Sequence, residues 1–310
     1  MLANKTFKAN LALSMSALFW GTTFIFQRDA MNHLSPLAYT GARFLLGALA
    51  LLPFALPGLR RAWAGGSAYG YDKRLRLAGP LLSGTFIFVG MCFQQYGLVW
   101  TTAGKAGFIT SLYVVIVPVI LLVIGRKLLF AEGLGAVLAL TGLYLLSFTG
   151  ITTLAPGDGI VLIGSFVWAG HVICLSWLAP KMDAMVLGFG QALVTGTLAL
   201  TAACLFNQLP TLAELSAAGV AILWGGILSV SFGFTFQVIG QRNATPAAAA
   251  IILQMEAVIA ALAGWIALDE RMTARMLTGA GVMLAGLLIS QLWPILQRGA
   301  QPPAPPESMN

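Results

Sequence analysis

Two charged side chains lie inside apolar stretches of this sequence, and each is of a type that can do chemistry there. Glu256 lies within "AAAAIILQMEAVIAALAGWIAL", and Arg43 lies within "SPLAYTGARFLLGALALL". Both stretches have the length of a membrane-spanning helix, about 20 residues. A carboxylate near the centre of a bilayer costs roughly 2.5–3.5 kcal/mol even on lenient scales, so such a group usually has a function. Glu256 is therefore a candidate for proton coupling or for binding a substrate amine.

The two charges are expected at similar depths in the membrane. At 1.5 Å per residue, Arg43 lies about 10 Å from one face and Glu256 lies about 15 Å from the other. In a hydrocarbon core of about 30 Å their depths then differ by about 5 Å, which an arginine side chain spans. The sequence leaves three arrangements open: an ion pair between the two, separate partners for each, or a shared water-filled cavity.

Polar and aromatic side chains with the same spacing occur in both halves of the chain. Trp20 and Thr23 are three residues apart and share one helix face, and Trp168 and His171 do the same. Such faces either pack against neighbouring helices or form an aromatic wall around a central cavity. In the second case His171 is a hydrogen-bonding or a titrating group of that wall.

Amide side chains inside apolar stretches are interpreted as links between helices or, second, as substrate ligands; they are Gln94, Gln191, Gln237 and Gln254. Pro118 is expected to kink its helix and to serve as a hinge. The residues that we predict to bind substrate are Trp20, Thr23, Arg43, Tyr113, Trp168, His171, Gln191 and Glu256.

Signatures of soluble catalysis and of metal binding do not occur in the sequence. There is no Walker loop, dinucleotide fingerprint, HExxH motif or nucleophile elbow. The two histidines and three cysteines lack the spacing of metal ligands, and every cysteine lies in an apolar stretch. We therefore expect no catalytic residues, no metal and no cofactor.

The composition indicates a polytopic membrane protein with the lipid bilayer as its surroundings. The chain is 58% hydrophobic and only 9% charged, with a mean hydropathy of +0.87. A soluble domain carries about 25% charged residues. The net charge of +7 does not predict a nucleic-acid partner, because the basic residues stand in short loops between apolar stretches.

Ten stretches are long and apolar enough to span a membrane. Most Lys and Arg residues fall on the side of the two termini, including the loop of residues 59–76. Both termini are therefore predicted to be cytoplasmic, in the inner membrane of the cell. The predicted spans are residues 10–27, 36–57, 77–99, 104–124, 133–150, 159–178, 185–206, 217–240, 246–268 and 276–296.

An internal repeat relates the two halves of the chain. Residues 93–109 align without a gap to residues 236–252 at an offset of 143, and an offset of 148 pairs Trp20 with Trp168. Each half then holds five spans, an odd number, so the second half enters the membrane in the opposite direction. Inverted repeats of this kind are typical of transporters, in which the halves surround a central site.

The repeat gives Glu256 a counterpart in the first half. The segment "QMEAVI" aligns with "SLYVVI", so that Tyr113 occupies the equivalent position. Tyr113 is therefore predicted to line the same cavity. The two halves share a scaffold, but only the second half places an acid at this position.

The chain resembles the EamA family of the drug/metabolite transporter superfamily over nearly all of residues 10–293. The resemblance rests on "ALFWGTTFIF", "SPLAYTGARFLLGALALL", "TTAGKAGFITSLYVVIVPV" and "ILQMEAVIAALAGWIALDER", in this order and with their duplication. Ala257 stands where the family commonly has a proline after the acidic residue. The resemblance implies ten helices and a small-molecule substrate such as an amino acid, another metabolite, a vitamin or a drug.

We expect a secondary transporter that exports a small metabolite or amino acid by alternating access, as a monomer or homodimer. The alternatives are a membrane-embedded enzyme, which needs a cluster of catalytic acids, and a sensor without transport activity. The expected organisation is a first repeat in residues 1–150, a second repeat in residues 151–296 and a disordered cytoplasmic tail in residues 297–310.

Overall fold

The computed structural model describes residues 2–63, 73–101, 103–147, 155–268 and 272–299, and the regular structure in them is helical. Ten of the described stretches are long and apolar enough to cross a membrane, which confirms the predicted all-helical, ten-span fold. The spans are Lys5–Ala30, Pro36–Arg61, Arg74–Trp100, Ala106–Val123, Phe130–Ser147, Pro156–Lys181, Ala184–Leu205, Gly219–Gln241, Pro246–Ile266 and Ala274–Trp293. The predicted disordered tail lies outside the described residues, apart from its first three positions, which continue the last helix.

Several spans are assembled from more than one helical segment. The segments are α1 (Leu2–Ala30), α2 (Pro36–Trp63), α3 (Lys73–Trp100), α4 (Ala103–Thr110), α5 (Tyr113–Val123), α6 (Phe130–Ser147), α7 (Pro156–Leu178), η1 (Ala179–Lys181), α8 (Ala184–Leu205), α9 (Leu212–Ala217), α10 (Gly219–Leu223), η2 (Trp224–Phe234), α11 (Thr235–Gln241), α12 (Pro246–Leu253), α13 (Met255–Leu268) and α14 (Ala274–Gly299).

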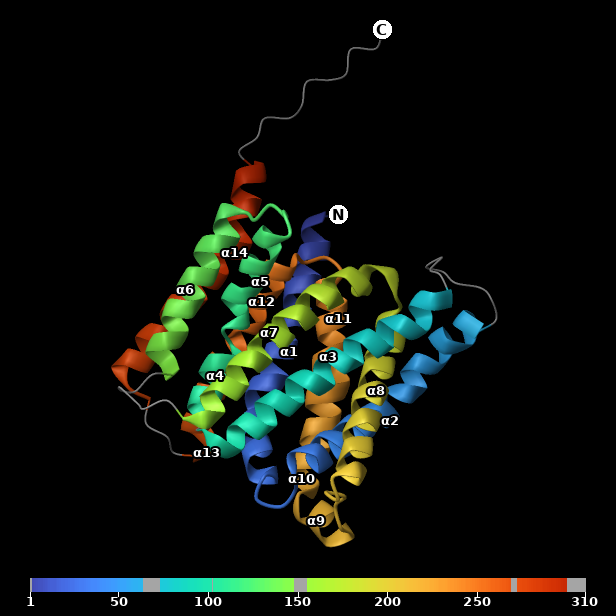
Figure 1. The fold of residues 1–310 in the computed structure, drawn as a ribbon. Coiled ribbons are helices and arrows are strands. Elements are labelled where there is room, and N and C mark those ends of the chain that lie inside the picture. Colours follow the sequence, from blue (N-terminus) through green and yellow to red (C-terminus); the bar gives the residue numbers. More distant parts are fainter. Residues whose placement is uncertain (1, 64–72, 102, 148–154, 269–271, 300–310) are drawn as a thin grey trace.

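The packing of the helices follows the repeat (Figure 1). Two pairs of equivalent helices lie along each other, α2 with α8 and α6 with α14. The other large contacts form pairs that the repeat relates. The contact of α3 with α7 corresponds to that of η2 and α11 with α1. The contacts of α4 and α5 with α7 correspond to those of α12 and α13 with α1. This pattern is that of two five-helix halves related by an approximate two-fold axis.

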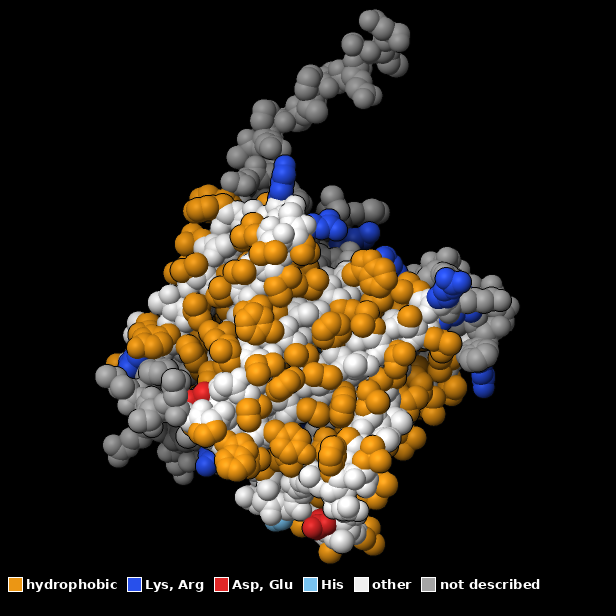
Figure 2. Space-filling view, in the orientation of Figure 1, with side chains coloured by type: hydrophobic (Ala, Val, Ile, Leu, Met, Phe, Trp, Pro, Cys, Tyr) orange, Lys and Arg blue, Asp and Glu red, His pale blue; other side chains and the backbone are white. Residues whose placement is uncertain are grey.

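The surface is what a bilayer requires of a bundle of apolar helices. Figure 2 shows a broad band of hydrophobic side chains across the middle of the molecule. Most of the Lys and Arg side chains visible in this view gather toward the end that carries both termini. Large apolar side chains such as Leu49, Phe54 and Ile266 are exposed, as expected where lipid tails replace water as the solvent.

Glycines allow the last helices of the two halves to approach each other closely. A Cβ added at Gly142 of α6 would meet the backbone oxygen of Gly279 in α14, and one added at Gly279 would meet the backbone oxygen of Gly142. Gly135 and Gly286 stand in the same relation further along these two helices. Small residues at such contacts are the usual means by which membrane helices pack.

The fourth and ninth spans are interrupted at equivalent positions. In the fourth span α4 ends at Thr110 and α5 begins at Tyr113; in the ninth, α12 ends at Leu253 and α13 begins at Met255. At both breaks backbone N–H groups bond to the carbonyl three residues earlier, which tightens the chain locally. The sequence predicted continuous helices here. The interruption of the fourth span precedes Pro118, which lies within α5, and the hinge expected at this proline stays a prediction.

The eighth span differs from its counterpart in the third. Residues Trp224–Phe234 wind as a π-helix, whereas the equivalent residues 81–91 of α3 stay α-helical. A π-helical stretch is rare and often marks a functional site. Here it carries Ser229 and Phe234, which lie at the centre of the molecule.

Candidate functional site

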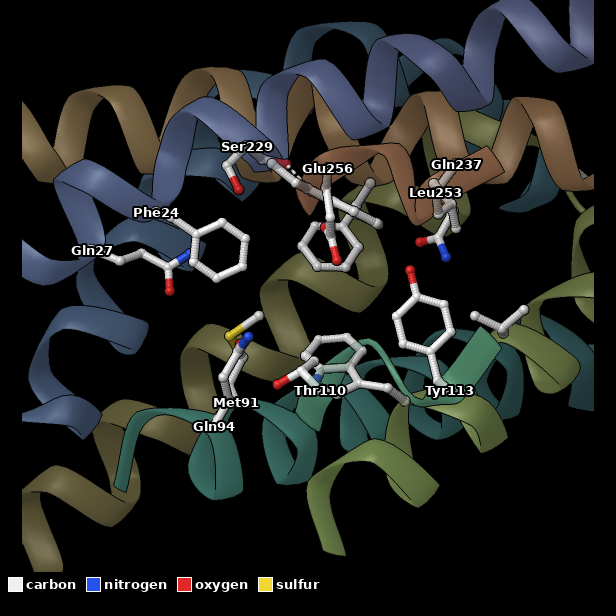
Figure 3. Close-up of a pocket in the computed structure, with 14 residues that line it drawn as sticks. Phe24, Gln27, Met91, Gln94, Thr110, Tyr113, Ser229, Gln237, Leu253 and Glu256 are labelled. Atoms are coloured by element: carbon white, nitrogen blue, oxygen red, sulfur yellow. Dashed lines mark hydrogen bonds between the residues drawn. The ribbon is translucent and has the colours of Figure 1, made fainter. Parts of the chain in front are cut away.

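A cavity lies between the two halves, at the level of the two helix breaks (Figure 3). Its volume is about 50 Å³. Since one water needs roughly 10–15 Å³ of such space, the cavity holds only a few water molecules in this conformation. The lining residues are Trp20, Phe24, Gln27, Met91, Gln94, Thr110, Tyr113, Trp168, Val172, Ser229, Phe234, Gln237, Leu253 and Glu256.

The lining of this central cavity is itself a product of the repeat. All but two of its residues form pairs related by the offsets of 143 or 148. The pairs are Trp20 and Trp168, Phe24 and Val172, Met91 and Phe234, Gln94 and Gln237, Thr110 and Leu253, and Tyr113 and Glu256. The approximate two-fold axis therefore runs through the cavity. The two unpaired members, Gln27 and Ser229, are both polar.

Glu256 carries the chemistry of the cavity. Its side chain projects from the first turn of α13 into the open space and is 7% exposed (Figure 3). Within the described part of the chain the carboxylate makes no hydrogen bond and no ion pair. Tyr113 points into the same space from the opposite wall. A buried carboxylate without a protein partner is costly, so the site favours a bound cation or a proton.

The two tryptophans form the aromatic wall that separates the cavity from the surrounding helices. Trp20 donates from Nε1 to the backbone oxygen of Ser229 at 3.2 Å and packs on Phe234, with ring centroids 4.8 Å apart. Its counterpart Trp168 packs edge-on against His171 at 5.9 Å. The Trp168 Nε1 has no hydrogen-bond partner. Both rings contribute to the cavity wall and to the hydrophobic core.

A second layer of polar side chains lies behind this wall. His171 and Gln191 are completely buried, and both contact Ser83 of α3. The Ser83 hydroxyl donates to Oε1 of Gln191 at 2.6 Å and lies 3.3 Å from Nε2 of His171. Thr23 is also completely buried, and its hydroxyl donates to the backbone oxygen of Phe19 at 2.6 Å. These groups stabilise helix contacts rather than line the cavity.

Arg43 belongs to the same second layer, on the side of the first half. It is 1% exposed, and its Nη2 donates to the sulfur of Met91 at 2.9 Å. The guanidinium carbon lies 4.8 Å from the ring centroid of Tyr39 and 5.2 Å from that of Phe44. Arg43 and Glu256 form no ion pair, which settles one of the arrangements that the sequence left open.

The cavity is closed toward the face that carries the termini. Leu13, Val117, Ala250 and Ile252 from three different spans are all buried in one apolar cluster there, between α5 and α12. Three of the four equivalent residues on the opposite face are less buried: Ala260, Gly107 and Ile109 are half-buried, and a Cβ at Gly107 would meet nothing. The counterpart of Leu13, Val161, is buried. The closure is therefore asymmetric although the scaffold is symmetric.

Threonine–carboxylate contacts fix the starts of the two interrupted spans. Thr245 caps α12 by accepting from the backbone N–H of Ala248 at 3.1 Å, and its hydroxyl donates to Glu132 of α6. On the other face Thr101, just before α4, donates to Asp158 of α7. The ends of these spans are thus anchored while their centres are interrupted beside the cavity.

Comparison with known proteins agrees with this architecture. Residues 7–148 and 155–292 each match the model of the EamA-like transporter family. The chain belongs to the EamA-like transporter family. Two relatives described as uncharacterized transporters, from Archaeoglobus fulgidus and Bacillus subtilis (YoaV), are 29% and 23% identical, over 93% and 91% of this chain and 87% and 96% of theirs. A solved crystal structure shares the fold, with a TM-score of 0.75 at 19% identity over 94% of this chain and 99% of that one.

Membership in the EamA-like transporter family makes the chain a multi-pass membrane transporter of a small molecule and not an enzyme. The alternatives of a membrane-embedded enzyme and of a sensor without transport activity are therefore wrong. In the described part of the chain no three His, Cys, Asp or Glu side chains form a group that could hold a metal ion. The acidic pair considered for catalysis, Asp269 and Glu270, lies outside the described residues.

The EamA-like transporter places the predicted substrate-binding residues in two layers. Trp20, Tyr113, Trp168 and Glu256 line the cavity. The other four lie in the second layer, and they too form two repeat pairs: Thr23 with His171, and Arg43 with Gln191. Substrate contact by residues of either layer stays a prediction, and for the second layer it requires a change of conformation.

The predicted substrate-binding residues include only four of the fourteen that line the cavity of this transporter. The missed residues are mostly apolar or uncharged, such as Phe24, Met91 and Phe234, and in the sequence they look like any residue of an apolar helix. The repeat was the one signal that could have identified some of these residues. The offset of 143 relates Gln94 to Gln237, whereas neither offset leads from Trp20 to Phe24. Both amides were interpreted as links between helices, and both line the cavity.

Proposed function

We propose that this EamA-like transporter is a secondary transporter that exports a small metabolite or amino acid from the cytoplasm by alternating access. The observation that carries the proposal is the Glu256 carboxylate, which lies in the central cavity beside a helix break and has no partner among the described residues. Such a group binds a substrate amine or a proton, and its occupancy changes the balance between two conformations.

The arrangement of the interrupted spans supports alternating access. The cavity is closed on one face by α5 and α12, and the equivalent segments α13 and α4 lie on the other face. Exchanging the conformations of the two halves would open the first face and close the second. The same cavity would then open to each side of the membrane in turn, with Glu256 at its centre.

The proposed location is the inner membrane of the cell, with both termini in the cytoplasm. It is supported by the Lys and Arg side chains that gather at the end of the termini (Figure 2). The transport unit in this proposal is a monomer or a homodimer.

The test is transport by purified protein in proteoliposomes, with a panel of amino acids and other small metabolites and with an imposed pH gradient. Glu256→Gln keeps the size of the side chain and removes its charge. We expect this variant to lose the acceleration by the pH gradient and to transport amines at least roughly tenfold more slowly, as for loss of a charged hydrogen bond. Glu214→Gln, on the exposed segment α9, is the matched control.

Two results would contradict the proposal. If Glu256→Gln moves substrate at the rate and with the pH dependence of the wild type, the carboxylate has no part in coupling. If the wild type moves no solute of the panel in either direction while the reconstituted protein is folded, secondary transport of these compounds is wrong. The control variant shows whether removal of any acidic side chain has the same effect.

A further inference from the structure

Arg43 is a buried cation for which the described structure supplies no anion. Its guanidinium makes no ion pair with any carboxylate of the described residues, and its Nε has no hydrogen-bond partner. The contacts it does have are a methionine sulfur, the faces of Tyr39 and Phe44, and a hydrogen bond to the neutral hydroxyl of Tyr39. A thioether is only a weak acceptor, and aromatic faces offset part of the cost of a buried charge.

A permanently unpaired guanidinium in the membrane interior is unfavourable. Charges in such positions pair with one another or face the pathway of a substrate or ion. Among the described residues that line the cavity, Glu256 is the one carboxylate, and it forms no ion pair with Arg43. An anionic group from outside the described chain would therefore be the partner that Arg43 lacks.

Met91 lies between Arg43 and the cavity. Its sulfur accepts from the guanidinium on one side, and the same residue lines the cavity on the other (Figure 3). Methionine is unbranched and changes its rotamer easily, so it can turn aside without movement of the helix. The guanidinium would then face the space into which Glu256 projects.

The repeat provides an internal comparison. The counterpart of Arg43 is Gln191, which accepts a hydrogen bond from Ser83, and the counterpart of Met91 is Phe234, a rigid ring packed against Trp20 and His171. On that side a neutral amide with a protein partner lies behind an aromatic ring. On the other side a cation without an anion lies behind a flexible side chain.

We propose that Arg43 binds the carboxylate of the substrate once Met91 turns aside, so that the transported compound is a zwitterion with its ammonium group at Glu256. This assignment rests on the proposed function and specifies its substrate class. The carboxylate accepts two parallel hydrogen bonds from the guanidinium, which only an arginine offers in this geometry. The aromatic side chains of the cavity wall, Trp20 and Trp168, suit an apolar side chain on that zwitterion.

The test compares three matched compounds on the purified full-length protein. Phenylalanine has both charges, 2-phenylethylamine lacks the carboxylate, and 3-phenylpropanoate lacks the amine; a leucine series is treated in the same way. Dissociation constants follow from the rise of the unfolding midpoint with ligand concentration. We expect the wild type to bind the zwitterion most tightly.

Arg43→Gln places at position 43 the residue that the repeat has at its counterpart, so the fold is expected to tolerate it. The substitution should raise the dissociation constants of the zwitterion and of the acid by roughly tenfold or more, as expected for a lost charged hydrogen bond. The dissociation constant of the amine should not change. Arg43→Lys retains the charge but not the paired donors, so its affinity for the zwitterion and the acid should lie between those of Arg43→Gln and the wild type.

Met91→Ala and Phe234→Ala form the second comparison. Met91→Ala removes the side chain that lies between Arg43 and the cavity. It should tighten binding of the zwitterion and of the acid relative to binding of the amine. Phe234→Ala enlarges the cavity at the equivalent position, behind which Gln191 lies in place of a cation. It should change the affinities for all three compounds by the same factor.

The inference is wrong if Arg43→Gln leaves the ratio of zwitterion to amine affinity as in the wild type. It is also wrong if the wild type binds no zwitterion more tightly than the matching amine. These results are distinguishable from failure of the proposed function, because flux of the same compounds is measured in proteoliposomes. Flux of amines without preference for a carboxylate leaves the proposed function standing and removes the role of Arg43.

Discussion

Single residues distinguish the two halves of a scaffold that the repeat makes otherwise alike. Tyr113 and Glu256 occupy equivalent positions in the cavity, but only the second has a charge. Arg43 and Gln191 differ in the same way in the second layer. A symmetric pair of positions with unlike side chains gives one site two chemically different ends. A substrate with two unlike polar groups is the kind of compound that such a site would orient.

A prediction at this scale concerns Ser83, which connects His171 with Gln191. Ser83→Ala removes the donor to Gln191 and leaves two buried groups without this partner. We expect a loss of about 0.5–2 kcal/mol in the free energy of unfolding, since hydrogen bonds between membrane helices are worth about this much. The measurement is the midpoint of unfolding of the purified protein, with affinity for phenylalanine as a second readout that stays unchanged.

Thr141→Ala is the control for Ser83→Ala. The exposed Thr141 donates only to the carbonyl of Val137 in its own helix, so its removal should not lower the midpoint measurably. An equal effect of the two substitutions would contradict the structural role given to Ser83.

The sequence predicted which residue types meet at the centre, but not in which layer each lies. Trp20 and Thr23 are three residues apart, which leaves them about 60° apart around the helix. This rotation places Trp20 in the cavity wall and Thr23 against a neighbouring helix. The same rotation separates Trp168, which lines the cavity, from His171, which is buried behind it. The angle of each helix about its own axis depends on packing with its neighbours, and one sequence does not contain that information.

Elements of this transporter are interrupted where the chemistry lies. Apolar length alone predicted ten spans, and the structure confirms them. The breaks at Ser111–Leu112 and at Gln254 were not predicted, because the residues around them are ordinary helix formers without proline or paired glycines. These interruptions are maintained by tertiary packing around the cavity. They place Tyr113 and Glu256 in the first turn of the segment that follows each break.

A prediction at the scale of elements follows from exchanging the two halves. Val117 of α5 and Ala250 of α12 are buried in the cluster that closes one face, and their counterparts are Ala260 of α13 and Gly107 of α4. We expect cysteines at the first pair to cross-link in the conformation described, and cysteines at the second pair to cross-link only in the alternate one. The native cysteines are first replaced, and single-cysteine variants are the controls.

Each cross-link should block transport and exclude the other. Addition of substrate should raise the yield of the second pair, since substrate allows the chain to pass between the two conformations. Active transport without any cross-link between positions 107 and 260 would contradict the exchange of the two halves.

The whole molecule has a polarity that its symmetry does not require. Inverted halves give both faces the same helix geometry, yet one face carries both termini and a group of basic side chains (Figures 1 and 2). The same face is the closed one, sealed by α5 and α12. If the basic side is cytoplasmic, the described conformation is one that is closed toward the cytoplasm. The orientation in the membrane thus decides whether the structure has the arrangement of an exporter after release or of an importer before binding.

Labelling in intact cells tests this orientation. Glu214 is exposed on α9, on the face opposite the termini, and Arg126 is exposed in the connection between α5 and α6, on their face (Figure 1). In a variant without native cysteines, Glu214→Cys should react with a membrane-impermeant maleimide in intact cells, because positive loops stay inside. Arg126→Cys should react only after the membrane is made permeable. Labelling of the second variant alone in intact cells would reverse the topology and, with it, make the described conformation one that is closed toward the outside.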